Sequence, residues 1–364
     1  MRVAITYNIN HEVVETSLIS SNIHHVDKLG RIGTQVLFKP RHQEFDDEYA
    51  EWDSMETIEA MKAGLSLNHE VILIEADKDV TENLKLAKPD IVFNVAEGKN
   101  GVSRESQVPA ICEMLNIPYT GSDPVTLGIC LDKSRAKEIL SYYKIPTANF
   151  RVINNFDDIN LSPIILPSII KPLHEGSSKG IYDSSLVQNE QQYRTESERI
   201  LTLYHQPVLV EEFLSGREFT VSLCGNDDTV EIFPIVEINF DSLPKGVNPI
   251  YSYEAKWIWD QLENPLDIFR CPTKLSTRLQ KQIETICLDT FAILKLKDWA
   301  RIDVRCDGKN RPHIIEINPI PGILPNPDDH SCFPKAARAA GIGYDELLNK
   351  ILNTALQRYS KLNA

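Results

Sequence analysis

The sequence predicts an α/β domain followed by two α+β domains, and three observations support this fold class. Residues 1–122 alternate short apolar runs with helical stretches, the pattern of a parallel sheet covered on both faces. A cluster of turn-forming residues at Pro118–Pro124 then marks a domain boundary. The remainder combines short strands, tight turns and long amphipathic helices, as α+β domains do. We therefore expect domains at residues 1–122, 123–213 and 214–364.

The predicted elements follow in order along the chain. The first domain should hold the strands Val3–Tyr7, Glu70–Glu75 and Ile91–Asn94 and the helices Trp52–Leu65 and Val108–Leu115, with the acidic residues 41–53 in an exposed loop. The second should hold a helix at Asp132–Tyr142 and strands near Ala148–Ile153 and Ser168–Pro172. Strands Val208–Phe213 and Glu218–Leu223 are predicted to pair with each other, and the long helices to span Leu275–Leu294 and Tyr344–Tyr359.

The composition excludes several classes of function. With 42% hydrophobic and 25% charged residues, the chain resembles an ordinary soluble globular protein. A net charge of −14 disfavours nucleic acid and anionic membranes as partners, because both are negatively charged. Seven scattered cysteines without a Cys-x-x-Cys pair indicate reduced thiols rather than a zinc site. No segment has the apolar character of a signal peptide or membrane span, so we expect a cytoplasmic protein acting on small molecules.

The most informative segment is a predicted hairpin with strands at Ala300–Arg305 and His313–Asn318. Both strands alternate polar and apolar residues with a period of two. If the hairpin folds symmetrically about its turn, Asp303 lies opposite Glu316, and Arg301 lies opposite Asn318. The apolar positions that would then point into a core are Ile302, Val304, Ile315 and Ile317.

The polar face of this hairpin is a candidate metal site. Carboxylates at facing positions lie ~5 Å apart and repel each other, so a divalent cation between Asp303 and Glu316 would relieve the repulsion. Asn318 offers a third oxygen, and hard oxygen ligands with room for water and phosphate favour magnesium. The chain then turns at Pro319 and Pro321, so that the Gly322 N–H can form part of an oxyanion cradle. The alternative is a solvated hairpin face of mixed charge.

A second group of candidates surrounds a possible phosphate-binding loop. Lys171 ends the apolar run 164–170, where a charge is costly unless an anion meets it. The glycine-rich loop, residues 174–180, follows; its glycines let the backbone wrap a ligand, and Ser177 and Ser178 can donate to phosphate oxygens. The alternative is an ordinary turn between two strands. Lys133 lies at the start of a predicted helix, where anions are favoured, although most such lysines are solvated.

Arg301-x-Asp303 followed by Glu316-Ile-Asn-Pro-x-Pro-Gly322 resembles the metal site of the ATP-grasp superfamily, in its D-alanine–D-alanine ligase branch. Further matches follow the family's order from Ile91 to Tyr344. The resemblance implies a three-domain ATP-grasp fold with ATP between the central and C-terminal domains. It also implies ATP-dependent ligation of a carboxylate to an amine through an acyl phosphate. The cofactors would be ATP and Mg²⁺, expected as two ions that Mn²⁺ can replace.

The resemblance implies roles for individual residues. Asp303, Glu316 and Asn318 would bind magnesium, while Lys133, Lys171, Lys256 and Ser178 would hold the triphosphate. Arg301 and the Gly322 N–H would stabilise the oxyanion of the tetrahedral intermediate, and Ser177 would join them at the catalytic centre. The segment Val208–Glu218 looks like the adenosine site, in which the contacts would come from Glu211, Glu212, Leu214 and Glu218.

The substrate-binding segments depart from the family's pattern. Trp257, in the lid loop Tyr251–Trp257, stands where D-alanine ligases usually carry tyrosine. Ser331 matches the serine that holds the second substrate's carboxylate, but it follows an inserted stretch, Pro325–His330. The segments Asn8–Ser17 and Glu97–Ser106 also differ from those that build the pocket for the first D-alanine.

We therefore expect a first substrate other than D-alanine. Glu97 could pair with its ammonium group and Arg104 with its carboxylate, or both residues could lie in a solvated loop. Three alternatives stay open: strict D-alanine–D-alanine ligation, another ATP-grasp chemistry such as glutamate addition or ester formation, and a sensor that binds ATP without ligation. The presence of all four residues Arg301, Asp303, Glu316 and Asn318 argues against the sensor, because a sensor does not need the whole set. The sequence names neither substrate and leaves a homodimer open.

Overall fold

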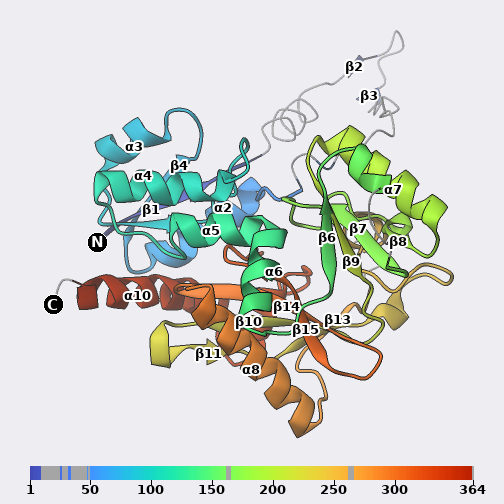
Figure 1. Cartoon of the computed structure of the whole chain (residues 1–364). Helices are drawn as coiled ribbons and strands as arrows, with labels where there is room; N and C mark the ends of the chain where they lie inside the picture. Colours follow the sequence, from blue (N-terminus) through green and yellow to red (C-terminus); the bar gives the residue numbers. More distant parts are fainter. Residues whose placement is uncertain are drawn as a thin grey trace.

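Three sheets, each accompanied by helices, organise the chain (Figure 1). This computed structural model describes residues 1–9, 25–26, 32–33, 47, 50–160, 165–260 and 266–362. The sheets follow one another along the sequence, at residues 2–94, 150–212 and 218–318. The first is parallel and the other two are antiparallel, which confirms the predicted α/β and α+β fold class. A short antiparallel ribbon joins β2 (His25–Val26) and β3 (Ile32–Gly33).

The first sheet has the strand order β4-β1-β5 (Glu70–Glu75, Arg2–Tyr7, Ile91–Asn94). Its strands lie within a residue of the predicted ranges. The accompanying helices are α2 (Met55–Ser66), α3 (Val80–Ala87) and α4 (Gln107–Leu115). Helix α2 begins later than predicted, because the Ser54 side chain caps it by accepting a hydrogen bond from the Thr57 N–H at 3.2 Å.

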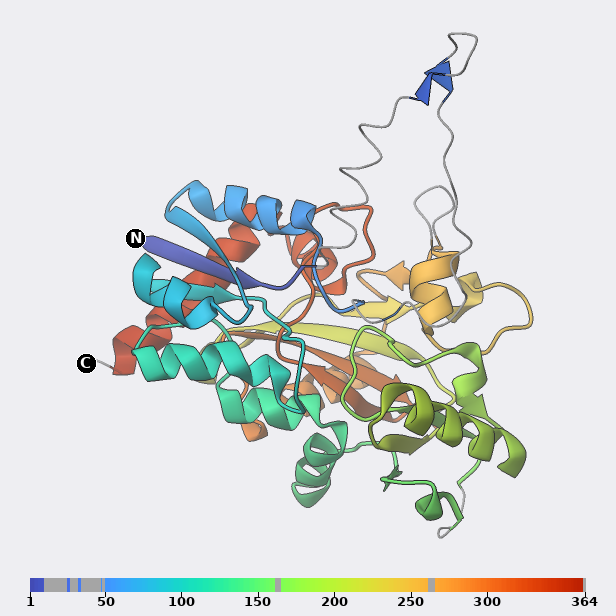
Figure 2. The same ribbon diagram turned by 90° about the horizontal axis from the view of Figure 1, so that it is seen from above.

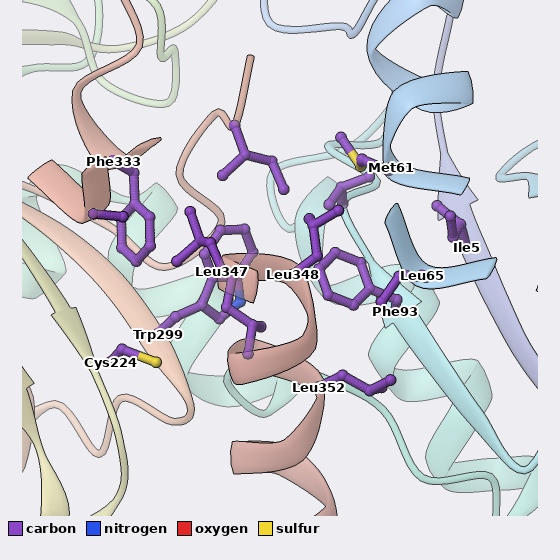
Figure 3. Close-up of a cluster of buried hydrophobic side chains, with 14 of the residues drawn as sticks. Ile5, Met61, Leu65, Phe93, Cys224, Trp299, Phe333, Leu347, Leu348 and Leu352 are labelled. Atoms are coloured by element: carbon purple, nitrogen blue, oxygen red, sulfur yellow. The ribbon is translucent and has the colours of Figure 1, made fainter. Parts of the chain in front are cut away.

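The C-terminal helix α10 (Tyr344–Leu362) returns to the first domain and lies beside α2 (Figure 2). A Cβ added at Gly64 of α2 would lie 2.7 Å from Asp345 Oδ1, so glycine permits this close approach. Leu348 and its apolar neighbours on α10 enter a core that also contains Ile5, Phe93 and Trp299 (Figure 3). One hydrophobic core therefore joins the beginning of the chain to its end.

The central sheet is antiparallel, in the order β6-β9-β7-β8 (Phe150–Ile153, Val208–Glu212, Ser168–Pro172, Leu186–Val187). Helix α7 (Glu190–Tyr204) covers it and shares a separate apolar core with it. Helices α5 (Pro124–Leu131) and α6 (Lys133–Tyr142) precede the sheet. The side chain of Asp132 caps α6 by accepting from the Ser134 N–H at 3.0 Å, which fixes Lys133 in the first turn.

The third sheet has the order β13-β12-β10-β14-β15, with β11 beside β10. Its strands are Phe269–Arg270, Val236–Ile238, Glu218–Cys224, Trp299–Cys306, Pro312–Asn318 and, for β11, Glu231–Ile232. Helix α8 (Thr277–Ile293) packs on one face, and α9 (Cys332–Ala339) lies on the side of the first domain. Short 3₁₀ turns occur at Arg104–Ser106, Asp157–Asn160, Asp183–Ser185, Asp227–Thr229 and Phe240–Ser242, and a π turn at Ala255–Trp259.

One predicted strand pairing is wrong. Strands β9 and β10, predicted to pair with each other, belong to the central and third sheets respectively. The link between them crosses from one sheet to the other, where the Gly216 N–H donates to the Cys306 carbonyl at 2.8 Å. A Cβ at Gly216 would lie 2.6 Å from that oxygen, so the glycine serves a close approach rather than a hairpin turn.

The predicted register of the β14–β15 hairpin is confirmed at its functional end. Asp303 pairs with Glu316, and Arg301 pairs with Asn318. A bulge between Asp303 and Val304 then shifts the ladder by one residue, so that Val304 faces Ile314. Ile314 therefore enters the core in place of the predicted Ile315, whose side chain lines a cleft instead.

The predicted exposed loop at residues 41–53 is described only at Asp47 and from residue 50 onward. Asp47 is buried, and the Glu51 side chain is only 8% exposed, because Asp47 contacts Gly180 and Glu51 contacts Gly176 in the central domain. Of the segment Asn8–Ser17, all but Asn8 and Ile9 lies outside the described residues. Among the helices described, none is long and apolar enough to cross a membrane.

Candidate active site

A cleft of about 260 Å³ lies between the central and third sheets, and most of the predicted site residues line it. These are Lys171, Ser177, Ser178, Glu211, Glu212, Leu214, Glu218, Lys256, Trp257, Arg301, Asp303, Glu316, Gly322 and Ser331. The predicted Lys133, Asn318, Glu97 and Arg104 do not line it. A larger cleft, of about 1140 Å³, involves α4 and α10 and contains none of the predicted residues. Size alone therefore does not identify the site.

The polar face of the β14–β15 hairpin forms one wall of this cleft. The Arg301 guanidinium donates to both Asp303 oxygens, at 3.1 and 3.0 Å, and the Asn318 amide donates to Asp303 at 3.1 Å. Glu316 forms an ion pair with Lys133 at 3.1 Å, which connects Lys133 to the cleft. Burial raises the pKa of Glu316, but Lys133 and Lys171 outweigh this effect and lower it below its usual value.

These residues fit a magnesium ion in the chemistry of their donors. Asp303, Glu316 and Asn318 supply oxygen atoms from facing positions of one ladder. No group of three or more His, Cys, Asp or Glu side chains suited to a metal occurs among the described residues. With only Asp303, Glu316 and Asn318 as protein ligands, a magnesium ion would keep ligand positions for water or phosphate, which is how Mg²⁺ is usually bound.

A buried group of charges lies opposite the hairpin. Glu211, 2% exposed, forms ion pairs with both Lys137 and Lys171. Burial raises the pKa of the Glu211 carboxyl, but the two lysines outweigh it and lower the pKa to about 2. Lys137 was missed in the sequence. Its position four residues after Lys133 on α6 was the available signal, since such residues share a helix face.

Glu218 and its surroundings form the end of the cleft nearest the link between the sheets. Arg305 pairs with Glu218 at 2.7 Å and also donates to the carbonyls of Leu214 and Pro249. Its guanidinium lies over the ring of Phe213, 4.6 Å from the centroid. Arg305 was not among the residues predicted from the sequence, although it lies two residues after Asp303 on the same strand. Nearby, Glu212 accepts a hydrogen bond from the Asn149 amide at 2.6 Å.

The glycine-rich loop and the lid loop are in contact over the cleft. The Ser178 hydroxyl donates to the Tyr251 carbonyl at 2.8 Å, and the Trp257 indole N–H donates to the Ser177 carbonyl at 3.3 Å. Ser177 and Ser178 both have left-handed backbone conformations, with φ of 49° and 60°. Such strain in non-glycine residues is often found at functional sites. The Ser178 hydroxyl, predicted to face phosphate, thus donates its hydrogen bond to the lid loop instead.

Lys256 of the lid loop also faces the cleft. Burial and the nearby Arg301 lower the pKa of Lys256 to about 8. Its ammonium lies 5.1 Å from the centroid of the Trp257 ring, which is itself 43% exposed. The positive groups Lys256 and Arg301 therefore share one region, a condition that favours an anionic ligand.

The predicted substrate residues Glu97 and Arg104 lie at the edge of the first domain. Arg104 is buried and pairs with the chain's own Glu51 and Glu175, at 2.6 and 3.5 Å, rather than facing open space. Burial raises the pKa of Glu97 well above its usual value, and the nearby Glu105 and Glu51 raise it further. Because Arg104 is buried, the alternative of a solvated loop is wrong for this residue.

Ser331 lines the same cleft and lies next to Gly322. Its hydroxyl donates to the Gly322 carbonyl at 2.9 Å and accepts from the Leu324 N–H at 3.2 Å. The preceding His330 contacts Asp260, and its ring lies edge-on to Phe269. The inserted stretch is thereby held against the segment that follows the lid loop.

Comparison with known proteins agrees with this geometry. The family model for the D-ala D-ala ligase C-terminus matches residues 139–353. A D-alanine–D-alanine ligase of Acinetobacter baumannii is 32% identical over 77% of this chain and 83% of that protein. An uncharacterized protein of Sinorhizobium fredii, y4sG, is 35% identical over 80% of this chain and 84% of its own length.

Solved structures share the whole fold. The D-alanine–D-alanine ligase of Bacillus anthracis matches with a TM-score of 0.69 and 23% identity, covering 99% of both chains. A structure of this ligase complexed with ATP matches with a TM-score of 0.65 and 20% identity. The fold, with a cleft between its second and third sheets, is that of an ATP-grasp ligase. This chain belongs to the D-alanine–D-alanine ligase family of those enzymes.

Proposed function

We propose that this ligase joins the carboxylate of one amino-acid-like substrate to the amine of another, and that its first substrate is not D-alanine. The observation that most supports ligation is the meeting of two groups in one cleft. The Asp303–Glu316 face comes from the third sheet, and Lys171 with the glycine-rich loop comes from the central sheet. Acidic metal ligands opposite lysines are what transfer of a phosphoryl group from ATP requires.

ATP would lie between the two sheets, with its triphosphate toward Lys133, Lys171 and Lys256. The adenosine would lie toward Glu211, Glu212, Leu214 and Glu218, where the cleft borders the link from β9 to β10. Because Glu211 already binds two lysines, we assign it to hold Lys137 and Lys171 in place as well. Ser177 and Ser178 would place the backbone of the glycine-rich loop over the phosphates.

Asp303, Glu316 and Asn318 would hold Mg²⁺, expected as two ions and replaceable by Mn²⁺. When bound, the metal neutralises charge on the phosphates. Arg301 is already directed to Asp303, and we propose that it also faces the developing oxyanion together with the Gly322 N–H. Ser331 would hold the second substrate's carboxylate beside Gly322.

The proposed reaction has two bond-forming steps. A carboxylate oxygen of the first substrate attacks the γ-phosphorus of ATP, the bond to the bridging oxygen breaks, and ADP leaves. The amine of the second substrate then attacks the acyl carbon, phosphate leaves with that oxygen, and the nitrogen loses a proton. The contact between the glycine-rich loop and the lid loop supports this chemistry, since an acyl phosphate must be kept from water.

The proposal about the first substrate depends on the residues around Glu97. The segment Glu97–Ser106 departs from the D-alanine ligase pattern, and its Arg104 is bound to Glu51. Function on a shared fold is set by such site residues. Glu97 would meet the ammonium of the first substrate, and the indole of Trp257 would cover that substrate.

A screen of paired D- and L-amino acids with ATP and magnesium would test the proposal. Phosphate release and mass spectrometry of the products would be measured together, with Asp303→Asn as the inactive control. We expect a condensed product and stoichiometric phosphate with a pair that does not begin with D-alanine. No phosphate release with any pair would favour an ATP sensor instead.

The relatives named D-alanine–D-alanine ligase favour one alternative, namely that this chain makes that dipeptide. The screen decides between the two, because efficient turnover with D-alanine alone would contradict our choice. We also infer a cytoplasmic location, which agrees with seven unpaired cysteines, of which Cys112, Cys130, Cys224, Cys287 and Cys306 are buried. Light scattering on the purified protein would show whether it forms a homodimer.

A further inference from the structure

Two carboxyl groups of the first domain, those of Glu97 and Glu105, lie together without a hydrogen-bond or ion-pair partner among the residues that the structure describes. We call them the carboxylate pair. Glu105 is only 8% exposed. Burial and the nearby Glu51 raise the pKa of Glu105 to about 7, and burial and Glu105 raise the pKa of Glu97. The fold therefore keeps two carboxyl groups where a negative charge is costly.

A close backbone contact brings the carboxylate pair together. Gly98, which follows Glu97, has a φ of +72°. A Cβ added to it would lie 2.7 Å from the carbonyl oxygen of Arg104, the residue before Glu105, so glycine is needed at this position. The Gly98 N–H also donates to the Asn8 side chain at 2.8 Å. The two glutamates are thus held side by side by the folded backbone.

The cations nearest to the carboxylate pair are bound to other carboxylates. The Arg104 guanidinium donates to both oxygens of Glu51, at 2.9 and 2.6 Å, and approaches Glu175 at 3.5 Å. Lys133, whose charge also acts on the pair, forms an ion pair with Glu316 at 3.1 Å. Because each of these cations already has a carboxylate partner, the pair offers its negative charge to a ligand.

The carboxylate pair lies beside the part of the cleft that residues 50–53 line. Trp52 lines the cleft, and its indole N–H donates to the Gly98 carbonyl at 3.2 Å. Asp53 lines the cleft too, and its carboxyl group has no partner among the described residues. Burial raises the pKa of Asp53 to about 7, and its charge is among those that, after burial, raise the pKa of Glu97. A third carboxylate without a counter-charge therefore connects the cleft to the pair.

We propose that Asp53, Glu97 and Glu105 form a subsite for a first substrate with a basic side chain, an amino acid that carries two positive charges. This assignment rests on the proposed function and names the class of first substrate within it. Glu97 receives the α-ammonium group, Glu105 receives the cation of the side chain, and Asp53 adds negative charge on the side of the cleft. A neutral side chain would leave Glu105 buried without a partner, and this cost selects against it.

Binding of single amino acids tests the subsite without turnover. Lysine, ornithine and 2,4-diaminobutyrate, in both configurations, would be titrated calorimetrically into the protein with a non-hydrolysable ATP analogue and magnesium. The counterparts that lack only the side-chain amine are norleucine, norvaline and 2-aminobutyrate. We expect at least one basic amino acid to bind about tenfold tighter or more than its counterpart, as a charge-assisted hydrogen bond implies. Equal affinities in all pairs would overturn the proposal.

Substitutions separate the two glutamates. We expect Glu105→Gln to reduce the preference for the basic amino acid to about twofold or less while the neutral counterpart binds as in wild type. Glu97→Gln should weaken both members of a pair alike, and Glu105→Asp should keep part of the preference. Glu82→Gln, at an exposed position of α3, is the control of equal charge change. A full preference in Glu105→Gln would overturn the proposal.

Thermal unfolding would show that the Glu105→Gln variant is folded. Its unfolding temperature without ligand should hold or rise, because glutamine keeps the volume and removes the repulsion with Glu97. If this variant does not fold, Asp53→Asn carries the same test, with a reduced preference for the basic amino acid as the expected result. An unchanged preference in that variant would then overturn the proposal.

Product analysis distinguishes failure of the subsite from failure of the proposed function. Ligated product from neutral first substrates, with basic amino acids neither bound more tightly nor ligated, would overturn the subsite and leave the ligase. Preferential binding of a basic amino acid that Glu105→Gln abolishes, with no product or phosphate release from any pair, would support the subsite and contradict the ligase.

Discussion

Lys256 carries a positive charge that its surroundings make easy to lose. Burial and Arg301 lower its pKa to about 8, whereas an exposed lysine titrates near about 10.4. Because the folded pKa is depressed, the charged form reduces stability below about pH 8, and this loss disappears as the pH rises toward about 10.4. The charge that favours ATP is thus lost at a lower pH than usual.

We therefore predict that ATP binding weakens above pH 8. If the charged form of Lys256 binds the triphosphate, the Kd should rise about fivefold between pH 8 and 9, as the protonated fraction falls. Calorimetric titrations of wild type and Lys256→Arg across this range would test it, because arginine stays charged. A wild-type Kd that is flat across the range would contradict the assignment.

The charge on Glu316 has two separable effects. In the ligand-free protein the Glu316 carboxylate pairs with Lys133, and its pKa is lowered by folding. The ionised carboxylate therefore stabilises the folded protein at pH values above the pKa that Glu316 has in the unfolded chain. This stabilisation is lost as the pH falls through the lower pKa of the folded state. We predict that Glu316→Gln lowers the free energy of unfolding by about 1–3 kcal/mol. It should also abolish turnover and most of the stabilisation by ATP with magnesium.

Thermal unfolding with and without magnesium would measure both effects of Glu316→Gln. Glu138→Gln is the matched control, since its partner Arg135 is exposed and such pairs contribute little. Wild-type turnover in Glu316→Gln would contradict the metal assignment, even if the stability fell as expected.

Alternation along the two strands was sufficient to predict the facing pairs at the functional end of the hairpin, before the bulge. Asp303 and Glu316 were placed correctly because a period of two leaves few registers that keep the apolar residues inside. Arg305 and Lys137 were missed for a different reason. Each binds a carboxylate of another element. Local spacing could place Arg305 on the face of Asp303 and Lys137 on that of Lys133, but it could not identify the partners Glu218 and Glu211.

At the scale of elements, the glycine-rich loop is held in a conformation that its sequence only partly favours. Gly180 has a φ of +75°, and a Cβ there would lie 2.4 Å from Pro172 Cγ. Ser177 and Ser178 adopt similar backbone conformations without the freedom of glycine. The contacts with the lid loop and with the first domain maintain this arrangement.

We predict that Gly180→Ala destabilises the protein by about 2–4 kcal/mol, through both the backbone strain and the clash with Pro172. Gly341→Ala separates the two causes, since Gly341 has a φ of +83° but no atom within 4 Å of an added Cβ. That control should cost only about 1 kcal/mol. Urea unfolding of both variants would measure the difference, and equal losses would show that the clash is relieved.

The hairpin bulge and the crossing from β9 to β10 are two features of strand pairing that could not be predicted from the sequence. The longer strands were located from their apolar residues, but the short strands β2, β3, β8, β11, β12 and β13 were not, and the partner of β9 was assigned by proximity in sequence. Gly216 suits either a turn or a close backbone contact, so composition could not decide between them. The bulge that exchanges Ile314 for Ile315 left no signal, because both residues are isoleucine.

At the scale of the whole molecule, the first and third domains share one core, the central sheet and α7 have their own, and α5 and α6 pack into a further core with the third sheet. The order of the three sheets follows the succession of strands and helices that the sequence predicts. The return of α10 to the first domain could not be predicted from the sequence. An amphipathic pattern shows that one face of a helix is buried, but not which other element covers that face.

We predict that Leu348→Ala weakens the first and third domains together. Leu348 is fully buried on α10, so its truncation should cost about 2–5 kcal/mol. Leu67, 69% exposed, provides Leu67→Ala as the control. Hydrogen exchange should accelerate in β1 and β14 alike and least in the central core around Ile170 and Tyr193. Acceleration confined to α10 would show that the shared core is not one cooperative unit.

The position of α10 also matters while the protein is being made. The strands of the first sheet emerge from the ribosome early, but the helix that covers them begins some 250 residues later. At about 5–20 residues per second, translation of that interval takes tens of seconds. During that interval the apolar side chains of Ile5, Met61 and Phe93 lack the partners that they have in the finished protein. A nascent chain of this enzyme should therefore present a binding surface to chaperones until translation is almost complete.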